Sequence, residues 1–435
     1  MPGGREHPSA VGYRRRVIDD ELDELLPALP AVALQGPKGV GKTMTALQRA
    51  RTVLSLDDEA QRALLEADPG RLDREPGPVL VDEWQRLPSV WDRVRRSVDA
   101  DPSGGRFLLT GSAAPIDAPV HSGAGRIVTL RMRPLALAER DLAAAAVSLG
   151  ALLGGGADVA GDSPVSLTDY VSEIVSSGYP AIRPLPERPR AAALDSYLDA
   201  VVQRDFPEQG LVVRRPQTLQ AWLAAYAAAT ASTASYNQIL KAATPGEGDK
   251  PARATVTAYR DVLAQLWLLD PVPGWVPSAS PFSRLGQAPK HHLADPALAA
   301  RLLAATPKSL LATGGAPGDV APAPRDGPLL GALFESLVTL SVRVYAQAAD
   351  AAVYHLRTRN GDHEVDLIVE GPDRQVVALE VKLSPTVDDG AVAHLRWLRD
   401  HIGDRLADAA VVTTGPYAYR RPDGIAVVPA ALLGP

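Results

Sequence analysis

Gly36-Pro37-Lys38-Gly39-Val40-Gly41-Lys42-Thr43 is the stretch that decides the expected fold, because it matches the pattern G-x-x-x-x-G-K-T without a gap. An apolar run, Ala31 to Gln35, precedes this loop, and a helical pattern follows it. Glycines in such a loop let backbone N–H groups turn inward around phosphate oxygens. Lys42 is then expected to reach the β- and γ-phosphates, and Thr43 to ligate Mg²⁺. The sequence therefore predicts a site for a nucleoside triphosphate, most simply ATP.

Two acids follow a second apolar run further along the chain. Val79 to Val81 reads as a strand that leads into Asp82 and Glu83. Asp82 is expected to hold Mg²⁺ through water, and Glu83 to orient and polarise the attacking water. The next strand ends in small polar residues, so Thr110 or Ser112 is expected to hydrogen-bond water or phosphate as a sensor. An ordinary polar strand end is the alternative interpretation of that last feature.

The order of loop, acids and polar strand end resembles the AAA+ class of ATPases, and the sequence has no N-K-x-D run that would select guanine. AAA+ proteins use an arginine from a neighbouring subunit to stabilise the transferring phosphoryl group. The resemblance therefore implies a homo-oligomer. Arg126, which heads a strand, is the first candidate for this arginine, and Arg95, Arg96, Arg131 and Arg133 compete with it. Each of them alone is better explained as a solvated surface residue.

A second group of charged residues lies near the C-terminus. Glu380 and Lys382 are two apart in one strand-like run, and Asp366 lies in the run before it. Because strand residues alternate faces, a hairpin places Asp366 beside Glu380, and two close carboxylates favour a divalent metal, Mg²⁺ or Mn²⁺. Lys382 is expected to orient or deprotonate a water there. Glu335 lies on an apolar helix, where a carboxylate needs a partner that the metal site can supply.

This D…E-x-K pattern resembles the restriction-endonuclease-like nucleases. The expected order of a helix, three strands, a helix and a strand agrees with the core of that class. The resemblance implies a Mg²⁺-dependent nuclease-like domain acting on DNA. Two alternatives stay open, namely a solvated salt-bridge cluster and a degenerate nuclease that binds without cutting.

The middle of the chain predicts mostly helices. The runs Ser235 to Ala243 and Ala254 to Leu263 read as two helices joined by a loop, with extended segments after them. This arrangement resembles a winged helix-turn-helix, in which basic and hydroxyl side chains face nucleic acid. The candidates are Arg253, Thr255, Thr257 and Arg260. A packing module that touches no nucleic acid is the alternative.

Composition is that of a globular protein, with 46% apolar and 22% charged residues in a chain of 435. The net charge of −6 means that DNA binding must rely on local patches. The absence of cysteine excludes disulfides and cysteine-based zinc sites, and it fits a reducing cytoplasm. The N-terminus lacks the apolar core of a signal peptide, and the weakly polar run Ala143 to Ala157 is too short to cross a bilayer. The expected location is therefore cytoplasmic, without a membrane partner.

Gly/Pro/Ala-rich stretches divide the chain into three expected parts: an AAA+-type P-loop ATPase domain over 1–140, a helical region with a winged-helix module over 165–300, and a nuclease-like α/β domain over 327–435. Together they resemble bacterial and archaeal ATPases that join an AAA+ core to a C-terminal domain of unknown function, number 4143. Beyond the loop, the stretches that carry the resemblance are Val81-Asp82-Glu83, Leu109-Thr110-Gly111-Ser112, Gly123-Ala124-Gly125-Arg126, Gly178-Tyr179-Pro180, Arg204-Asp205, Phe334-Glu335, Arg357-Thr358, Glu364-Val365-Asp366 and Leu379-Glu380-Val381-Lys382. The resemblance implies ATP hydrolysis coupled to a DNA-directed nuclease-like domain. A nucleotide-switched DNA- or protein-binding protein is the alternative.

Overall fold

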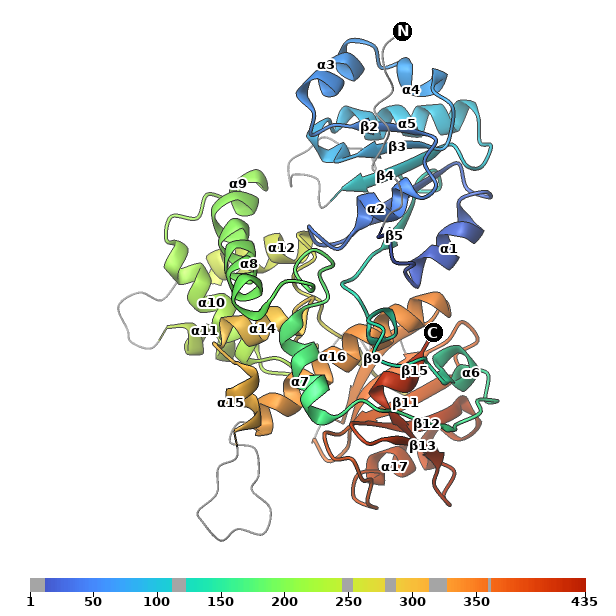
Figure 1. The fold of residues 1–435 in the computed structure, drawn as a ribbon, viewed down its shortest axis with the longest axis vertical. Helices are drawn as coiled ribbons and strands as arrows, with labels where there is room; N and C mark the ends of the chain where they lie inside the picture. The colour runs from blue at the N-terminus through green and yellow to red at the C-terminus, as the bar shows by residue number, and fades with distance from the viewer. Residues whose placement is uncertain (1–11, 112–122, 245–252, 278–286, 313–326, 359–360) are drawn as a thin grey trace. The chain divides into compact units, whose positions relative to one another are not determined.

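The computed structural model describes residues 12–111, 123–244, 253–277, 287–312, 327–358 and 361–435 (Figure 1). The chain divides into two compact units, Met1–Met132 and Arg133–Pro435, and each is considered by itself. Ser112, one of the two sensor candidates, lies outside the described residues.

The first unit is built on a five-stranded sheet in the order β2-β3-β4-β1-β5, in which every neighbouring pair is parallel (Figure 1). This confirms the predicted α/β fold with a parallel sheet. The strands are β1 (Ala31–Gln35), β2 (Thr52–Ser55), β3 (Val79–Asp82), β4 (Phe107–Gly111) and β5 (Val128–Arg131). Because β4 lies between β1 and β3 and all three are parallel, their carboxyl ends lie side by side. The glycine-rich loop follows β1, Asp82 ends β3, and Thr110 lies near the end of β4, so these groups come together.

Helices pack on this sheet, which explains why β1, β3 and β4 are almost continuously apolar and buried. Alternate strand residues such as Ala31, Val79 and Phe107 share a core with Leu65 and Trp91 from the helices. Helix α2 contacts β1, β3 and β4 directly. The described helices are α1 (Ile18–Leu25), α2 (Lys42–Leu47), α3 (Glu59–Ala67), α4 (Arg71–Arg74) and α5 (Ser89–Ala100). Of these, α2 is the helical pattern expected after the loop.

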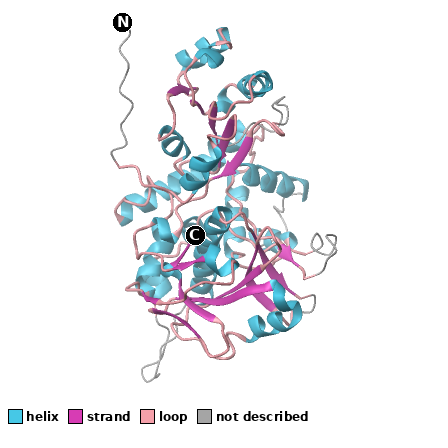
Figure 2. Cartoon of the chain, turned by 90° about the vertical axis from the view of Figure 1, so that its right-hand side faces the viewer, coloured by secondary structure: helices cyan, strands magenta, loops and turns pink. Residues whose placement is uncertain are grey.

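The second unit contains an eight-stranded mixed sheet in the order β7-β13-β14-β12-β11-β10-β9-β8, whose strands are magenta in Figure 2. Its strands are β7 (Gly161–Asp162), β8 (Gly274–Trp275), β9 (Ala352–Arg357), β10 (Glu364–Glu370), β11 (Val376–Val381), β12 (Leu406–Thr413), β13 (Tyr417–Arg420) and β14 (Ala426–Pro429). Two short strands, β6 (Val147–Ser148) and β15 (Leu433–Gly434), pair separately. Helix α17 (Ala393–Ile402) packs on the large sheet through Leu395 and Leu398, while α16 (Gly327–Ala348) contacts β9, β10 and β11.

The remaining helices of the second unit are α6 (Leu149–Leu153), α7 (Leu167–Ser176), α8 (Glu187–Ala200), α9 (Phe206–Glu208), α10 (Pro216–Ala228), α11 (Tyr236–Ala243), α12 (Arg253–Gln265), α14 (Pro296–Leu302) and α15 (Pro307–Leu311). Helices α11 and α12 agree with the two helices expected in the middle region. Two antiparallel bridges, Leu269↔Leu293 and Val272↔Lys290, follow them in the segments expected to be extended. The assignment of this module as a winged helix stays a prediction.

The boundary between the units differs from the expected end of the first domain at residue 140. Residues 133–140 belong to the second unit, where their backbone is held by side chains and by another loop. Leu137 N–H donates to Ser341 Oγ at 3.0 Å, and Ala138 N–H donates to Tyr345 Oη at 2.8 Å, both on α16. Leu135 N–H donates to the carbonyl of Gly178 at 2.8 Å. The two expected parts 165–300 and 327–435 likewise share one compact unit.

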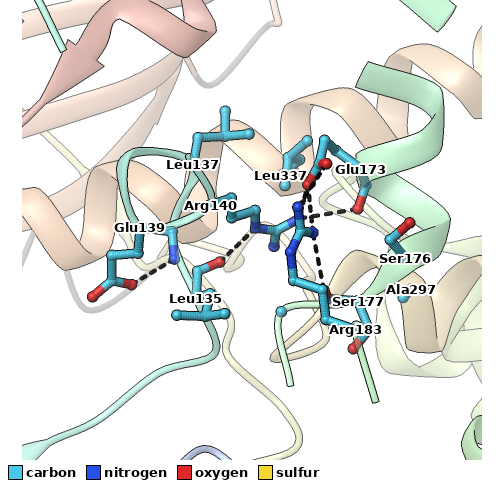
Figure 3. A network of polar contacts seen from close by, with 12 residues as sticks. Leu135, Leu137, Glu139, Arg140, Glu173, Ser176, Ser177, Arg183, Ala297 and Leu337 are labelled. Carbon is cyan, nitrogen blue, oxygen red and sulfur yellow. Dashed lines mark hydrogen bonds and ion pairs between the residues drawn. The ribbon is translucent and has the colours of Figure 1, made fainter. Parts of the chain in front are cut away.

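A buried network of ion pairs lies at the end of the segment 133–140 (Figure 3). The carboxylate of Glu173 accepts from Arg140 at 3.1 Å and from both terminal nitrogens of Arg183, at 2.6 and 2.8 Å. Burial alone would raise the pKa of Glu173, but Arg183 and Arg140 outweigh it, so this pKa lies below its ordinary value. Arg140 also donates to the carbonyl of Leu135 at 2.9 Å, so the network fixes the start of the second unit.

Helix α16 is long and apolar enough to span a bilayer by length and composition, and it alone is so among the described helices. In the structure, 72% of its most apolar stretch is buried within the unit. The helix therefore serves as a core element. The sequence interpretation had considered only the run Ala143 to Ala157 in this respect.

Candidate functional site

The loop between β1 and α2 adopts the conformation that its glycines allow. Gly39 and Gly41 have φ angles of 83° and 101°, in the left-handed region that favours glycine. Gly36 is required for a different reason, because a Cβ there would lie 2.1 Å from the backbone oxygen of Met132. Any side chain at Gly36 would therefore force the loop away from the residue that follows β5.

Lys42 begins α2 and is buried, with 6% of its surface exposed. Its ammonium donates to the carbonyls of Gly36 and Pro37 at 2.8 and 2.9 Å, so the side chain folds back over the loop. Burial lowers the pKa of Lys42 to about 8, although the charges of Glu83 and Asp82 oppose this shift. The loop thus presents a desolvated cation, which gains strongly from a phosphate.

Three polar side chains meet where β3 and β4 end. The hydroxyl of Thr43 donates to Asp82 Oδ1 at 2.8 Å, and that of Thr110 donates to the same oxygen at 2.5 Å. Asp82 is buried, and parallel pairing of β3 with β4 sets it opposite Thr110. A hydroxyl and a carboxylate in contact are oxygen ligands of the kind Mg²⁺ prefers, so Thr43 and Asp82 fit the expected metal. The ion would neutralise charge on the phosphates. Of the two sensor candidates, Thr110 is thereby placed at the site.

Glu83 follows Asp82 directly and has left-handed backbone angles, with φ 55° and ψ 42°. This conformation is costly for a residue with a side chain, by about 1 kcal/mol or more. Its carboxylate accepts a hydrogen bond from the amide of Gln85. Burial, followed by the neighbouring charge of Asp82, raises the pKa of Glu83. A half-buried carboxylate with a raised pKa beside the loop has the properties of a general base.

A cluster that the sequence interpretation missed braces the loop and α2 from the N-terminal side. Arg16 donates to the carbonyl of Val40 within the loop at 3.0 Å. Asp19, which is 1% exposed, accepts from Tyr13 and from Arg49, both at 2.6 Å. Arg49 follows α2 in the chain, so these contacts fix α2 to the segment before β1. The available signal was a helix pattern over Ile18 to Leu25, in which three apolar residues at helical spacing alternate with acids.

Three of the candidate arginines, Arg126, Arg95 and Arg133, have partners within their own units. Arg126 is exposed and lies 2.8 Å from Asp99, and Arg95 lies 3.4 Å from the same carboxylate. Arg133 is buried against Asp270 at 2.9 Å in the second unit. These contacts explain Arg133 as a structural residue. The role of Arg126 in a neighbouring subunit stays a prediction.

The lowered pKa of Lys42 predicts that nucleotide affinity falls as pH rises above neutrality. A bound phosphate favours the charged ammonium, so binding must take up a proton once the free lysine has lost it. With a pKa of about 8 in the free protein, we expect the dissociation constant for ATP to be about tenfold weaker at pH 9 than at pH 7. Calorimetric titration in buffers of different ionisation enthalpy measures both the affinity and the proton uptake.

Lys38 provides the control for this pH dependence. Its charge lowers the pKa of Lys42, so Lys38→Ala should move the loss of affinity to higher pH. A flat affinity profile up to pH 9.5, with no proton uptake, would contradict the assignment of Lys42 as the titrating group.

The second group of predicted residues lies on β10 and β11. The last paired residues there are Leu367 and Leu379, which puts Asp366 and Glu380 at the same level of the hairpin. Asp366 Oδ2 accepts the backbone N–H of Val381 at 2.9 Å. Glu380 accepts from Lys382 at 2.7 Å, and Lys382 is 40% exposed. The structure thus brings together Asp366, Glu380 and Lys382 as the sequence predicted.

The predicted simple alternation fails on both strands. A bulge interrupts the pairing of β10 with β9, so Val365 and Ile368, three residues apart, belong to one core. On β11 every residue is buried, including Glu380, so neither face of this strand is solvated. Burial and then the charge of Asp366 raise the pKa of Glu380, and the same two causes raise the pKa of Glu335.

Lys290 occupies the centre of this group, and the sequence interpretation missed it. Its ammonium lies 2.8 Å from Glu335, 3.0 Å from Asp366 and 3.4 Å from Glu364. Burial would lower the pKa of Lys290, but these three carboxylates raise it above its ordinary value. Among the residues that the structure describes, no three histidine or acidic side chains are arranged to hold a metal ion. Glu335 therefore has a lysine as its partner where a metal was expected.

Three stretches of the chain match known domain models. Residues 29–140 match an AAA domain, residues 167–309 match a Domain of unknown function (DUF8612), and residues 330–433 match a Domain of unknown function (DUF4143). The first and third matches confirm the AAA and domain-of-unknown-function parts of the resemblance. The nuclease-like nature of the C-terminal region stays a prediction.

Full-length relatives exist in mycobacteria. The uncharacterized proteins Mb2031c of Mycobacterium bovis and Rv2008c of Mycobacterium tuberculosis are each 26% identical to this chain over 447 residues. That alignment covers 99% of this chain and 88% of each relative.

Solved structures resemble the chain only distantly. The Walker-type ATPase PABY2304 of Pyrococcus abyssi is 14% identical with a TM-score of 0.39, covering 68% of this chain and 98% of its own. The ORC2 protein of Aeropyrum pernix, in ADPNP–ADP complexes, is 14% identical with a TM-score of 0.30, covering 68% and 95%. At these scores the likeness adds nothing to the match with the AAA domain.

Proposed function

We propose that this chain is a Mg²⁺-dependent ATPase whose nucleotide cycle switches the second unit between two binding states. The observation that carries the proposal is the meeting of Thr43, Asp82 and Thr110 at one carboxylate oxygen, beside Lys42 and Glu83. At the carboxyl ends of neighbouring strands, these groups supply a cation that binds phosphate, a Mg²⁺ site and a general base. The match of residues 29–140 to an AAA domain supports the same activity.

In this proposal Lys42 and the loop amides hold the phosphates, and Thr43 with Asp82 hold Mg²⁺. Glu83 takes a proton from the attacking water, for which its raised pKa suits it. An arginine from a neighbouring copy, with Arg126 as the candidate, would complete the charge stabilisation, so we also propose a homo-oligomer. A cytoplasmic location belongs to the same proposal.

DNA is the proposed partner class, with contact through α11 and α12. The basic residues Arg253 and Arg260 lie on α12, and Arg260 stacks over the ring of Tyr236 at 4.8 Å. Few other cations gather there, so binding should be weak and sensitive to salt.

A second candidate function is Mg²⁺- or Mn²⁺-dependent cleavage of DNA by Asp366, Glu380 and Lys382. Their shared position at the end of the β10–β11 hairpin favours it. The contacts of Lys290 with Glu335 and Asp366 favour the alternative, a unit that binds without cutting, because they use the oxygens that a metal needs. We therefore place the non-cutting alternative first.

A matrix of conditions separates these proposals. ATP hydrolysis and cleavage of plasmid and single-stranded DNA are measured with ATP or without it, in Mg²⁺, Mn²⁺ or EDTA, for the parent, Lys42→Ala and Asp366→Ala. We expect Mg²⁺-dependent ATP hydrolysis that is lost in Lys42→Ala and kept in Asp366→Ala, with DNA left intact throughout. DNA cleavage that disappears in Asp366→Ala would establish the nuclease, and no ATP hydrolysis by any assembly state would contradict the ATPase.

A further inference from the structure

Lys290 lies in the second unit among three carboxylates that belong to two different elements. Glu335 comes from α16, and Glu364 and Asp366 come from β10. The side chain of Lys290 is only 1% exposed, and all three contacts are within 3.4 Å of its nitrogen. An ammonium has three N–H donors and no acceptor. Two of these donors form hydrogen bonds, to Glu335 and Asp366, and Glu364 adds a third negative charge at ion-pair distance.

The backbone of Lys290 is held as firmly as its side chain. Lys290 N–H donates to the carbonyl of Val272 at 2.9 Å, and Val272 N–H donates back to Lys290 at 2.8 Å. The neighbouring bridge Leu269↔Leu293 continues the same antiparallel pairing. This pairing fixes the backbone at Lys290, and withdrawing the ammonium would leave buried carboxylates without a counter-charge, which is strongly unfavourable.

Lys290 does not contact every carboxylate oxygen of the cluster. Asp366 Oδ2 takes the N–H of Val381, and Glu380 Oε1 takes the ammonium of Lys382. Glu380 Oε2 is buried without a hydrogen-bond partner among the described residues, and Glu380 as a whole is 5% exposed. A buried, unpaired carboxylate oxygen calls for a cation or donor. The carboxylate oxygens of the cluster are thus ligands of the kind that Mg²⁺ or Mn²⁺ binds, but the ammonium of Lys290 already contacts those of Glu335 and Asp366.

We infer that Lys290 is the resident cation of this cluster, so that the native protein binds no divalent ion there, and that a neutral side chain at position 290 would convert Glu335, Asp366 and Glu380 into a divalent-cation site. Without Lys290, Glu335 and Asp366 lose the ammonium between them and repel each other, and Mg²⁺ or Mn²⁺ binds such oxygen ligands together with the unpaired oxygen of Glu380. The inference goes beyond the proposed function and is independent of ATP hydrolysis.

The test measures Mn²⁺ binding to the nucleotide-free, full-length chain by the loss of the free Mn²⁺ resonance signal, together with thermal unfolding in Mn²⁺ and in EDTA. The parent should bind no Mn²⁺ that depends on Asp366. Lys290→Met should gain about one ion per chain and unfold several degrees higher in Mn²⁺ than in EDTA. Lys382→Met is the matched control, because it removes the same charge from the same cluster but leaves Lys290 in place, and it should gain no ion.

A further pair of variants attributes the site and guards against misfolding. Lys290→Met/Asp366→Asn should lose the ion that Lys290→Met gains. If Lys290→Met does not fold, Lys290→Met/Glu335→Gln keeps the parent net charge and retains Glu364, Asp366 and Glu380 as ligands, and it should bind Mn²⁺. Binding of Mn²⁺ by the parent that is lost in Asp366→Asn would overturn the inference, as would the absence of any gain in both Lys290 variants. ATP binding should be the same in all of them, which separates this outcome from a failure of the ATPase proposal.

Discussion

Lys42→Ala is expected to weaken ATP binding at least about 100-fold, and with it to abolish hydrolysis. Each hydrogen bond from a charged donor to a phosphate contributes about 1.5–3 kcal/mol, so losing two of them removes at least about 3 kcal/mol, which is about two decades of affinity. The effect is concentrated in the complex. Among the described residues of the free protein, the ammonium of Lys42 hydrogen-bonds to two backbone carbonyls, those of Gly36 and Pro37, and these are neutral groups.

The matched control is Lys38→Ala, which removes the same charge from the same eight-residue loop. Lys38 is only half-buried, and we expect its loss to change the affinity by less than about tenfold, in line with an exposed charge. Fluorescent-nucleotide titration measures both variants, and thermal unfolding checks that each is folded. Comparable losses for both would show that the loop acts through its total charge, against the specific role assigned to Lys42.

The first unit could be predicted well from sequence because its signals are local. The loop, the acids after β3 and the polar end of β4 each lie within a few residues, and parallel pairing brings strand ends to one edge. For this reason the sequence alone indicates Thr110 as a residue of the site, where it contacts Asp82. The cluster of Tyr13, Arg16, Asp19 and Arg49 was not predicted, since the contact that ties it to α2 joins Asp19 to Arg49, 30 residues further along.

The second unit shows where local reasoning ends. The hairpin that joins Asp366 to Glu380 is local, and the sequence predicted it. Lys290 contacts residues 45 and 76 positions further along, and no pattern in its own segment indicates carboxylate partners. The bulge in β10 could not be predicted from the sequence either, because it depends on the pairing with β9 and not on an unusual residue. For this reason the predicted metal site at Asp366 and Glu380 did not include Lys290. The resemblance to a nuclease motif does not indicate this lysine either.

Glu83→Gln is expected to bind ATP as the parent does and to hydrolyse it about 10²–10³ times more slowly. A general base contributes about 10²–10⁴-fold to rate, and glutamine keeps the size of the side chain but takes up no proton. The substitution is well suited to this position. Residue 83 has left-handed backbone angles, and glutamine bears the same steric penalty there as glutamate, so the change in rate reports on chemistry and not on relief of strain.

Single-turnover hydrolysis and nucleotide affinity together measure the effect, with Glu75→Gln as the control. Glu75 lies in the same unit and pairs with Arg71 on the surface, so its variant should keep the parent rate. Gln85 is the one residue that complicates the comparison, because its amide donates to Glu83. An amide at position 83 can accept the same hydrogen bond through its oxygen, so the position of the side chain should be kept. Equal hydrolysis rates for Glu83→Gln and the parent would therefore remove Glu83 from the mechanism and leave activation of the water to another group.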